Sequence, residues 1–211
     1  MKLKEFYEWK KQNAGILIES PQYTSIPANF ALDLEDETER KRYSRKIMQY
    51  GEKTPIKKIG NYTLYEMDKR YVLTHNTSGE VVCLVEYRKE QIQFINRLCV
   101  KEIMVWRNKG IGETAGLPHW IFFNQLLPNY KTVVSDQWHT PDGKNFWGTL
   151  IAKSITDNKA KVYFVNTLAP NRKAIEITDT DDIPKLSAWG SEQKYQARRL
   201  ILTTDPLDTT Q

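Results

Sequence analysis

The stretch from Val100 to Gly116, V-K-E-I-M-V-W-R-N-K-G-I-G-E-T-A-G, constrains this chain more than any other. Val100 and the apolar run 103–105 predict a buried strand, and Arg107 to Gly112 then give R-x-x-G-x-G before an apolar helix that begins near Pro118. Glycines without a Cβ let the backbone approach a ligand closely, and a helix begins with unpaired N–H groups that carry roughly half a positive charge. Strand, glycine turn and helix together predict a site for a phosphate or pyrophosphate.

Length and composition indicate a globular protein. With 211 residues, 40% of them hydrophobic and 27% charged, the chain can bury a core that needs no metal ion or disulfide bond to stabilise it. Cys83 and Cys99 lie in apolar, strand-like runs, which predicts buried reduced thiols. The N-terminus has no apolar core of signal-peptide length, and no run of about 18 apolar residues occurs. We therefore expect a cytoplasmic protein without membrane association.

The net charge of +5 suits an anionic ligand. Nucleic acid is an alternative partner that we do not favour, because aromatic and basic residues do not recur as they do in single-strand binders.

Hydrophobic periodicity predicts helices first and then strands. A short amphipathic helix is expected over residues 2–13 and a second over 35–50, where Tyr43, Ile47 and Tyr50 share one face. The β-rich runs 62–67, 71–74, 80–87 and 91–98 are separated by short turns, which indicates antiparallel hairpins that lead into the strand before the glycine turn. The later expected elements are a helix over 117–127 stopped by Pro128, a strand at 132–135, a helix at 142–153, strands at 160–167, 174–178 and 199–203, and a loop or short helix at 183–189.

This order predicts an α+β protein with a mixed, mostly antiparallel central sheet flanked by helices, in which the strands that end at Trp106 and Ser135 are parallel and splayed. We expect residues 1–60 to form a helical extension packed on a core of residues 61–170, and residues 171–211 to extend the same domain with strand and loop.

Two ligand classes compete for the glycine turn. A dinucleotide site would use Gly110, Gly112 and Ala115 as G-x-G-x-x-A, with Asp136 holding the ribose. That site belongs to a doubly wound fold, whereas here several hairpin-linked strands precede the turn. The order of strands, glycine loop, helix, strand, helix and strand instead resembles the GCN5-related N-acetyltransferase (GNAT) superfamily.

The resemblance is sharpest at Arg107-x-x-Gly110-x-Gly112, which fits the family signature of arginine or glutamine, x, x, glycine, x, glycine or alanine. In that family the loop's backbone N–H groups hold the pyrophosphate of coenzyme A. The resemblance therefore implies acetyl-coenzyme A as co-substrate, without a metal. It implies a cofactor site made of Met104, Val105, Arg107, Asn108, Lys109, Gly110, Ile111 and Gly112.

Departures from the family pattern accompany the matches. The family often has a tyrosine general acid, and Trp147 stands at its spacing in this chain. An indole N–H donates a hydrogen bond but releases no proton in catalysis. No proline-containing turn precedes Arg107, and Gly116 with Pro118 delays the helix. Such departures resemble the divergent members encoded by bacteriophages and mobile elements.

Four residues carry the candidate acid–base chemistry. Glu102 precedes the signature on a strand where several acetyltransferases keep a glutamate base. The alternative is that Glu102 lies on the solvent-exposed face of the sheet and has no catalytic role. Asp136 and His139 follow the next strand and can move protons, while Ser135 can donate a hydrogen bond. The alternative for this group is that it caps a turn and the following helix.

Tryptophans and histidines add weaker candidates. Trp138 and Trp147 can line a substrate pocket, although core packing explains them as well. His75 and His119 have no paired spacing typical of a metal site.

The function that we expect from the resemblance is acyl-coenzyme A dependent N-acyl transfer, in which an amine attacks the thioester directly. The acceptor is a small-molecule or macromolecular amine, Glu102, Asp136 and His139 are the catalytic candidates, and Ser135, Trp138 and Trp147 are the substrate-pocket candidates. The alternative is an inactive member of the fold that binds a protein or nucleic-acid partner.

Overall fold

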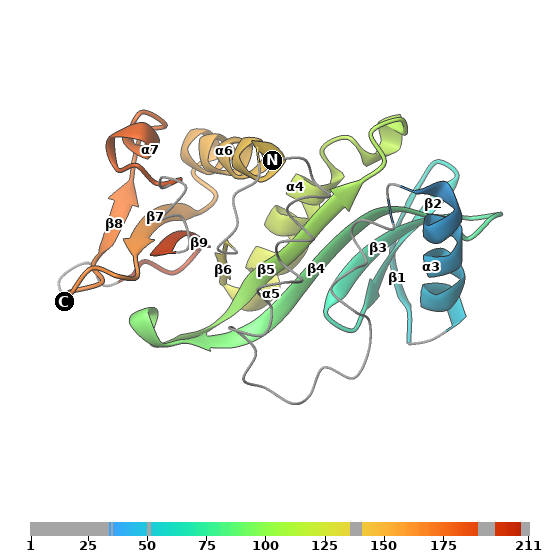
Figure 1. Cartoon of the computed structure of the whole chain (residues 1–211), viewed down its shortest axis with the longest axis horizontal. Coiled ribbons are helices and arrows are strands. Elements are labelled where there is room, and N and C mark those ends of the chain that lie inside the picture. Colours follow the sequence, from blue (N-terminus) through green and yellow to red (C-terminus); the bar gives the residue numbers. More distant parts are fainter. Residues whose placement is uncertain (1–33, 35, 50–51, 136–140, 190–196, 208–211) are drawn as a thin grey trace. The chain divides into compact units, whose positions relative to one another are not determined.

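The computed structural model describes residue 34 and residues 36–49, 52–135, 141–189 and 197–207. The chain divides into two compact units, residues 1–84 with 106–115 and residues 85–105 with 116–211. The strands β4 (Val81–Ile92) and β5 (Arg97–Arg107) contribute to both units (Figure 1). The helix expected over residues 2–13 lies outside the described residues. The division into residues 1–60, 61–170 and 171–211 stays a prediction.

The first unit is built on antiparallel hairpins. Its described elements, besides the start of β4, are α3 (Glu37–Gln49), β1 (Thr54–Ile59), β2 (Tyr62–Met67), β3 (Arg70–His75) and the short 3₁₀ turn η3 (Gly112–Thr114). β1 pairs antiparallel with β2, and β2 pairs antiparallel with β3 from Tyr62 opposite His75 to Met67 opposite Arg70. In strand order β4 follows β3.

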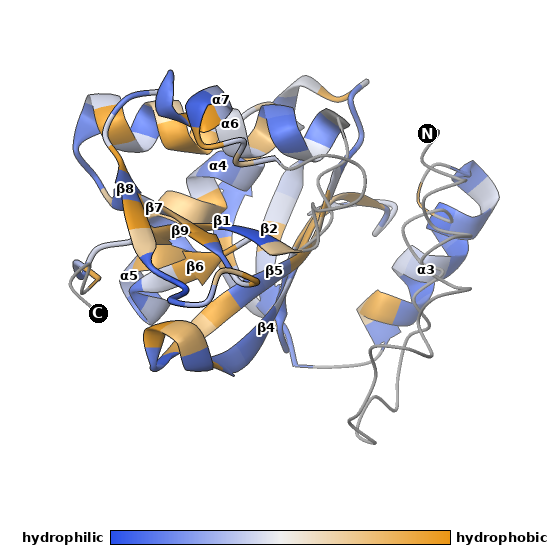
Figure 2. Cartoon of the chain, turned by 60° about the vertical axis from the view of Figure 1, so that its left-hand side comes forward, coloured by the Kyte–Doolittle hydropathy of each residue, from blue (hydrophilic) through white to orange (hydrophobic). Residues whose placement is uncertain are grey.

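Helix α3 confirms the helix expected over residues 35–50. Tyr43 and Ile47 are buried on one face, while Tyr50 lies outside the described residues. The helix is otherwise mainly hydrophilic, as expected of a surface helix that buries one stripe (Figure 2). The buried Ser44 ties it to β4, because its Oγ donates to the Arg40 carbonyl at 2.7 Å and accepts the Val81 N–H at 2.8 Å.

Strand β1 was missed by the sequence prediction. Its residues T-P-I-K-K-I are exposed or half-buried, so the strand lacks the apolar alternation that predicts a buried face. Pro55 and a register irregularity between Pro55 and Lys57 are features that edge strands tolerate.

The second unit contains a parallel strand pair within antiparallel surroundings. Besides parts of β4 and β5, its elements are η2 (Gln93–Ile95), α4 (Leu117–Ile121), η4 (Phe122–Leu126), α5 (Leu127–Tyr130), β6 (Thr132–Val134), α6 (Pro141–Asp157), β7 (Lys161–Asn166), β8 (Ala174–Ile177), α7 (Asp182–Lys185) and β9 (Arg198–Thr203). From β4 onward the strand order is β5, β6, β9, β7, β8. β5 pairs parallel with β6, with Val100 opposite Val133, whereas β6 with β9, β9 with β7 and β7 with β8 are antiparallel.

The strand pairing confirms the expected fold class, an α+β protein with a mixed, mostly antiparallel sheet flanked by helices. The predicted parallel pairing of the strand before the glycine loop with the strand at 132–135 is confirmed as well. A doubly wound parallel sheet, which the dinucleotide alternative requires, is excluded by the antiparallel pairs.

The turn expected at residues 88–90 was placed wrongly, and so was the start of the strand expected at 91–98. β4 continues to Ile92, and the chain turns at Gln93–Asn96, where Asn96 takes φ 46°. Charged residues do not end the strand, because they lie at half-exposed or exposed positions and Arg88 pairs with Glu90 at 2.5 Å. Asparagine tolerates the left-handed conformation that this turn requires.

Pro128 does not stop the helix after the glycine loop. The helical segment runs through α4, the π-helical turn η4 and α5 to Tyr130, and it buries Leu117, Ile121 and Phe122. Pro128 stands near the start of α5. Because proline has no N–H to donate to the preceding turn, the helix accommodates it by widening the turn before it.

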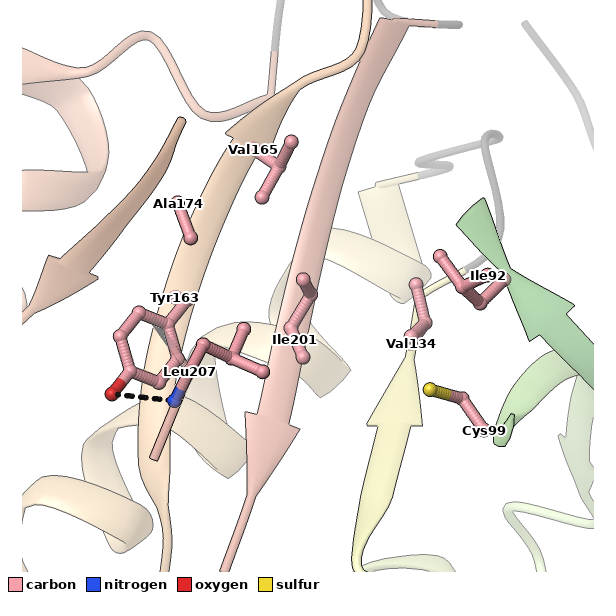
Figure 3. Packing of buried hydrophobic residues seen from close by; sticks show 8 residues of the cluster. All are labelled: Ile92, Cys99, Val134, Tyr163, Val165, Ala174, Ile201 and Leu207. Carbon is pink, nitrogen blue, oxygen red and sulfur yellow. Dashed lines mark hydrogen bonds between the residues drawn. The ribbon is translucent and has the colours of Figure 1, made fainter. Parts of the chain in front are cut away.

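A buried cluster in the second unit joins β4, β5, β6, β7, β8 and β9. Cys99 lies in it with Ile92 and Val134, and the Tyr163 hydroxyl accepts the Leu207 N–H at 3.3 Å (Figure 3). Cys83 is buried in the first unit, and both cysteines are free, which confirms the expected reduced thiols. Within the described residues, no helix is both long and apolar enough to span a membrane.

Ser44→Ala tests the attachment of α3 to β4. The substitution leaves the buried Val81 N–H without its acceptor, so the free energy of unfolding should fall by about 1–3 kcal/mol. Urea denaturation followed by circular dichroism measures this change. The matched control is Ser78→Ala, whose hydroxyl accepts the Glu80 N–H at an exposed position, and a loss as large as that of Ser44→Ala would contradict the assignment.

Because its two thiols are buried, the protein should become less stable toward unfolding in alkaline solution. Burial raises the pKa of Cys83 to about 12 and that of Cys99 to about 11, from an ordinary value of 9.0. The folded chain then holds these protons more tightly than the unfolded chain does. The thiols' stabilisation is complete below pH 9, and each loses about 1.4 kcal/mol per pH unit as the pH rises toward its native pKa.

Denaturation of the wild type and of Cys83→Ala with Cys99→Ala from pH 8 to 10.5 measures this slope. A shallower slope in the double variant is the expected result. Equal slopes, or native thiols that iodoacetamide alkylates at pH 8, would show that the thiols are accessible.

Candidate functional site

The glycine loop follows β5 in the first unit, and Asn108 organises it. The Asn108 N–H donates to the Val82 carbonyl at 2.8 Å, which ties the loop to β4. The Asn108 carbonyl accepts the Ile111 N–H at 3.2 Å and the Thr114 hydroxyl at 2.8 Å. Thr114 is buried, so its hydroxyl forms hydrogen bonds within the loop rather than with solvent. These bonds hold Arg107–Thr114 in a compact turn.

The two signature glycines differ in what surrounds them. The Gly110 N–H donates to Asn108 Oδ1 at 3.0 Å, and a Cβ at Gly110 would lie 3.3 Å from that oxygen. A Cβ at Gly112 would meet no atom within 4 Å. Both glycines are exposed, and the side of Gly112 where a Cβ would lie is open space, whereas the Gly110 N–H is already paired with Asn108.

The remaining cofactor candidates line up along β5 and the loop. Met104, Val105 and Arg107 are half-buried, Ile111 is half-buried, and Lys109 is exposed. Arg107 lies near enough to the buried Cys83 to oppose the rise in its thiol pKa, although burial dominates. The loop therefore has cationic side chains at Arg107 and Lys109, which favour an anion.

Glu102 and Trp147 are joined by a short hydrogen bond within the second unit. The indole Nε1–H of Trp147 donates to Glu102 Oε2 at 2.6 Å. Trp147 is 1% exposed, and Glu102 is half-buried on β5. Trp147 is therefore packed in the core, as the alternative for it expected, and its indole is a hydrogen-bond donor to Glu102.

The polar groups of Ser135 are hydrogen-bonded to the neighbouring strand β9. It is fully buried, its N–H donates to the Leu200 carbonyl at 2.8 Å, and its Oγ accepts the Leu200 N–H at 3.0 Å. Asp136, Trp138 and His139 lie outside the described residues, so their part in the site stays a prediction.

The aromatic partners of Trp147 were not foreseen from the sequence, although core packing was the alternative given for it. Phe122 meets the Trp147 ring edge-on at 6.1 Å and 89°, and Phe146 meets Phe122 at 5.1 Å. His119 stacks on Phe146 at 4.6 Å, with its Nε2 3.4 Å from the Phe146 carbonyl oxygen. The only signal in the sequence was the aromatic content of the segments near residues 120 and 147, which also fits an ordinary core.

Histidines do not assemble a metal site in the described part of the chain. No group of at least three His, Cys, Asp and Glu side chains there is arranged to hold a metal ion. His75 Nδ1 lies 3.3 Å from the Ser78 N–H at the end of β3, which is the contact of a hairpin turn.

Comparisons with known proteins find similarity at the level of structure and not of sequence. No protein-family model matches the chain, and no curated protein matches it in sequence. A solved structure of Naa50 from Arabidopsis thaliana, in complex with the bisubstrate analogue CoA-Ac-MVNAL, aligns with 98% of this chain and 95% of that chain at 8% identity and a TM-score of 0.34. A TM-score of this size carries no argument, so the fold class rests on the observed strand pairing.

Gly112→Asp tests the loop as an anion site. The variant should fold, because a Cβ there meets nothing within 4 Å, yet it places a carboxylate beside the open backbone. Affinity for coenzyme A should fall at least tenfold, measured by calorimetric titration. Gly112→Ala is the matched control, and it should lose less because it adds only a methyl group. Unchanged affinity in a folded Gly112→Asp protein would remove this site.

Proposed function

We propose that this chain is an acyl-coenzyme A dependent N-acyltransferase, which transfers an acetyl group to an amine by direct attack. The observation that carries the proposal is the 2.6 Å hydrogen bond from the Trp147 indole to Glu102. A base that takes a proton within a short-lived reaction complex needs a fixed position. The buried indole supplies that fixation for a half-buried carboxylate.

The glycine loop supports the co-substrate. The exposed Gly112 leaves its backbone open, and Arg107 and Lys109 supply positive charge near the loop. Backbone N–H groups with cationic side chains suit the pyrophosphate of coenzyme A. In this proposal the loop binds the nucleotide portion of acetyl-coenzyme A.

The reaction that we propose needs one proton acceptor. The amine nitrogen attacks the thioester carbonyl carbon, the new C–N bond forms, and the C–S bond breaks. Coenzyme A leaves as a thiolate, and the proton on the nitrogen passes to Glu102 directly or through water. The thiolate takes a proton from water, which is feasible because ordinary thiols have a pKa of about 8.5. Trp147 supplies no proton in this scheme.

The second candidate is an inactive relative of acyltransferases that binds a protein or nucleic-acid partner. Trp147 favours it, because an indole stands at the spacing where the resemblance places a proton-releasing tyrosine. Thiol release from acetyl-coenzyme A in the presence of amines separates the two functions.

Glu102→Gln tests the proposal. The amide carbonyl still accepts the indole N–H, so the fold should survive, while the proton acceptor is lost. The rate should fall by roughly 10² to 10⁴, with coenzyme A affinity little changed. Thiol release with a chromogenic disulfide measures the rate.

Glu176→Gln is the matched control. Glu176 lies on β8 of the same unit and pairs with Lys161 at 3.0 Å, so this variant should keep full activity. Full activity in Glu102→Gln would transfer the role of base to another group, and wild-type protein that binds acetyl-coenzyme A without thiol release would favour the binding function.

A further inference from the structure

Arg198 is a cation for which the described residues supply no counter-ion. It begins β9 in the second unit, and its side chain is half-buried. Its Nε is shielded from solvent and has no hydrogen-bond acceptor, and no described carboxylate forms an ion pair with its guanidinium. Buried donors without an acceptor are rare in native proteins, and an ion that the structure does not contain is one cause. Arg198 is therefore a candidate site for an anionic ligand.

Phe164 supports the guanidinium of Arg198. The guanidinium carbon lies over the Phe164 ring, 5.3 Å from its centroid, and Phe164 is 3% exposed. Asn166 stands opposite Arg198 on β7, but its side-chain oxygen accepts the Leu168 N–H at 3.2 Å. A guanidinium on an aromatic ring still presents N–H donors along its edge, where they match a carboxylate or a phosphate. Packing thus positions the charge and leaves donors for a ligand.

Two other arginines of the described chain also have a buried, unpaired Nε. Arg88 has a counter-ion, because its Nη2 donates to Glu90 Oε2 at 2.5 Å. Arg70 belongs to the first unit, whereas the candidate base Glu102 belongs to the second. Arg198 differs from both, because it lacks a counter-ion and shares a unit with Glu102.

Arg198 and Glu102 point to the same face of the sheet. Val134 of β6 pairs with Lys101 of β5 and with Ile201 of β9, so these three side chains share one face, which is that of the buried cluster in Figure 3. Because side chains alternate along a strand, Glu102, next to Lys101, points to the opposite face. Arg198, three positions before Ile201, points to that opposite face as well.

The strand pairing also gives the spacing between the two residues. Only β6 lies between β5 and β9, so the backbones of β5 and β9 are about 10 Å apart. Glu102 is level with Ser135, which is hydrogen-bonded to Leu200. Arg198 lies two residues from Leu200, about 7 Å along the strand, which places the Cα atoms of Arg198 and Glu102 roughly 12 Å apart. Two long side chains shorten that distance to the length of a small molecule.

We infer that Arg198 binds an anionic group of the acceptor, so the acceptor is an amine that also carries a carboxylate or a phosphate. The inference rests on the proposed function and names the substrate class of its site. An uncharged analogue leaves the guanidinium without its partner, and charge-assisted hydrogen bonds are the stronger ones. The anionic acceptor should therefore be favoured about tenfold or more over its uncharged analogue.

Two pairs of amines test the inference. The first pair is 4-aminobutyrate and 4-aminobutanamide, and the second is O-phosphoethanolamine and ethanolamine. In the wild type, kcat/KM should be about tenfold or more higher for the charged member of one pair, and that pair identifies the anion. Arg198→Gln should lose most of this preference. Because the amines ionise alike in both assays, the change in the ratio reports the protein and not the amine.

Arg199→Gln is the matched control. It removes the same charge from the next residue, whose partner Val165 belongs to the cluster on the opposite face of the sheet. A general loss of positive charge would lower the preference in both variants. Only a specific site at Arg198 leaves the preference of Arg199→Gln unchanged.

An NMR titration of the wild type tests binding without catalysis. Because the Arg198 Nε–H is shielded from solvent, its signal should be observable in the ¹H–¹⁵N spectrum, and its loss in Arg198→Gln or Arg198→Lys assigns it. The anionic amine should shift this signal at millimolar concentrations, and its uncharged partner should not.

The outcomes separate the inference from the proposed function. Equal kcat/KM for the charged and uncharged amines, or a preference that persists in Arg198→Gln, overturns the inference and leaves the acyltransferase intact. A signal that shifts while no amine releases thiol keeps the anion site and removes the acyltransferase. A signal that no anionic amine shifts overturns the anion site, whether or not thiol is released.

Discussion

A buried indole N–H must find an acceptor, and this requirement shapes the candidate site. Trp147 is 1% exposed, so leaving its N–H unpaired would cost about 1–3 kcal/mol. Its acceptor is a carboxylate oxygen of Glu102, which ties α6 to β5 within the second unit. Edge-on packing by Phe122 fixes the ring in turn. The position of the one candidate base that the structure describes therefore follows from core packing.

In the glycine loop, too, polar groups are paired with protein partners. Asn108 uses its N–H, its carbonyl and its side-chain oxygen within the first unit, and Gly110 is already a donor to that oxygen. A phosphate that binds Gly110 has to replace Asn108 Oδ1, an exchange of one acceptor for a charged and stronger one. At Gly112 the position that a Cβ would take is open space. The two glycines of the loop therefore differ in how closely the neighbouring groups of the loop approach them.

The order of elements and the fold class could be predicted because they depend on local patterns. Short turns between the β-rich runs before the glycine loop predicted a mixed, mostly antiparallel sheet, and the parallel pair of β5 and β6 was part of that prediction. β1 escaped prediction because an exposed edge strand has no hydrophobic alternation. The turn at Asn96 was misplaced because charged residues at 88–90 imitate a turn, although they lie along an exposed side of a long strand.

The pairing of Trp147 with Glu102 escaped prediction for a different reason. The two residues are 45 positions apart, and no local pattern specifies which buried donor meets which carboxylate. Their chemistry explains why the contact is worth making once the two side chains meet. A half-buried carboxylate carries part of a desolvation penalty that a neutral acceptor largely avoids, and the hydrogen bond from the buried indole offsets some of that penalty. The same bond satisfies a donor that water cannot reach, so one contact solves the pairing problem of both residues.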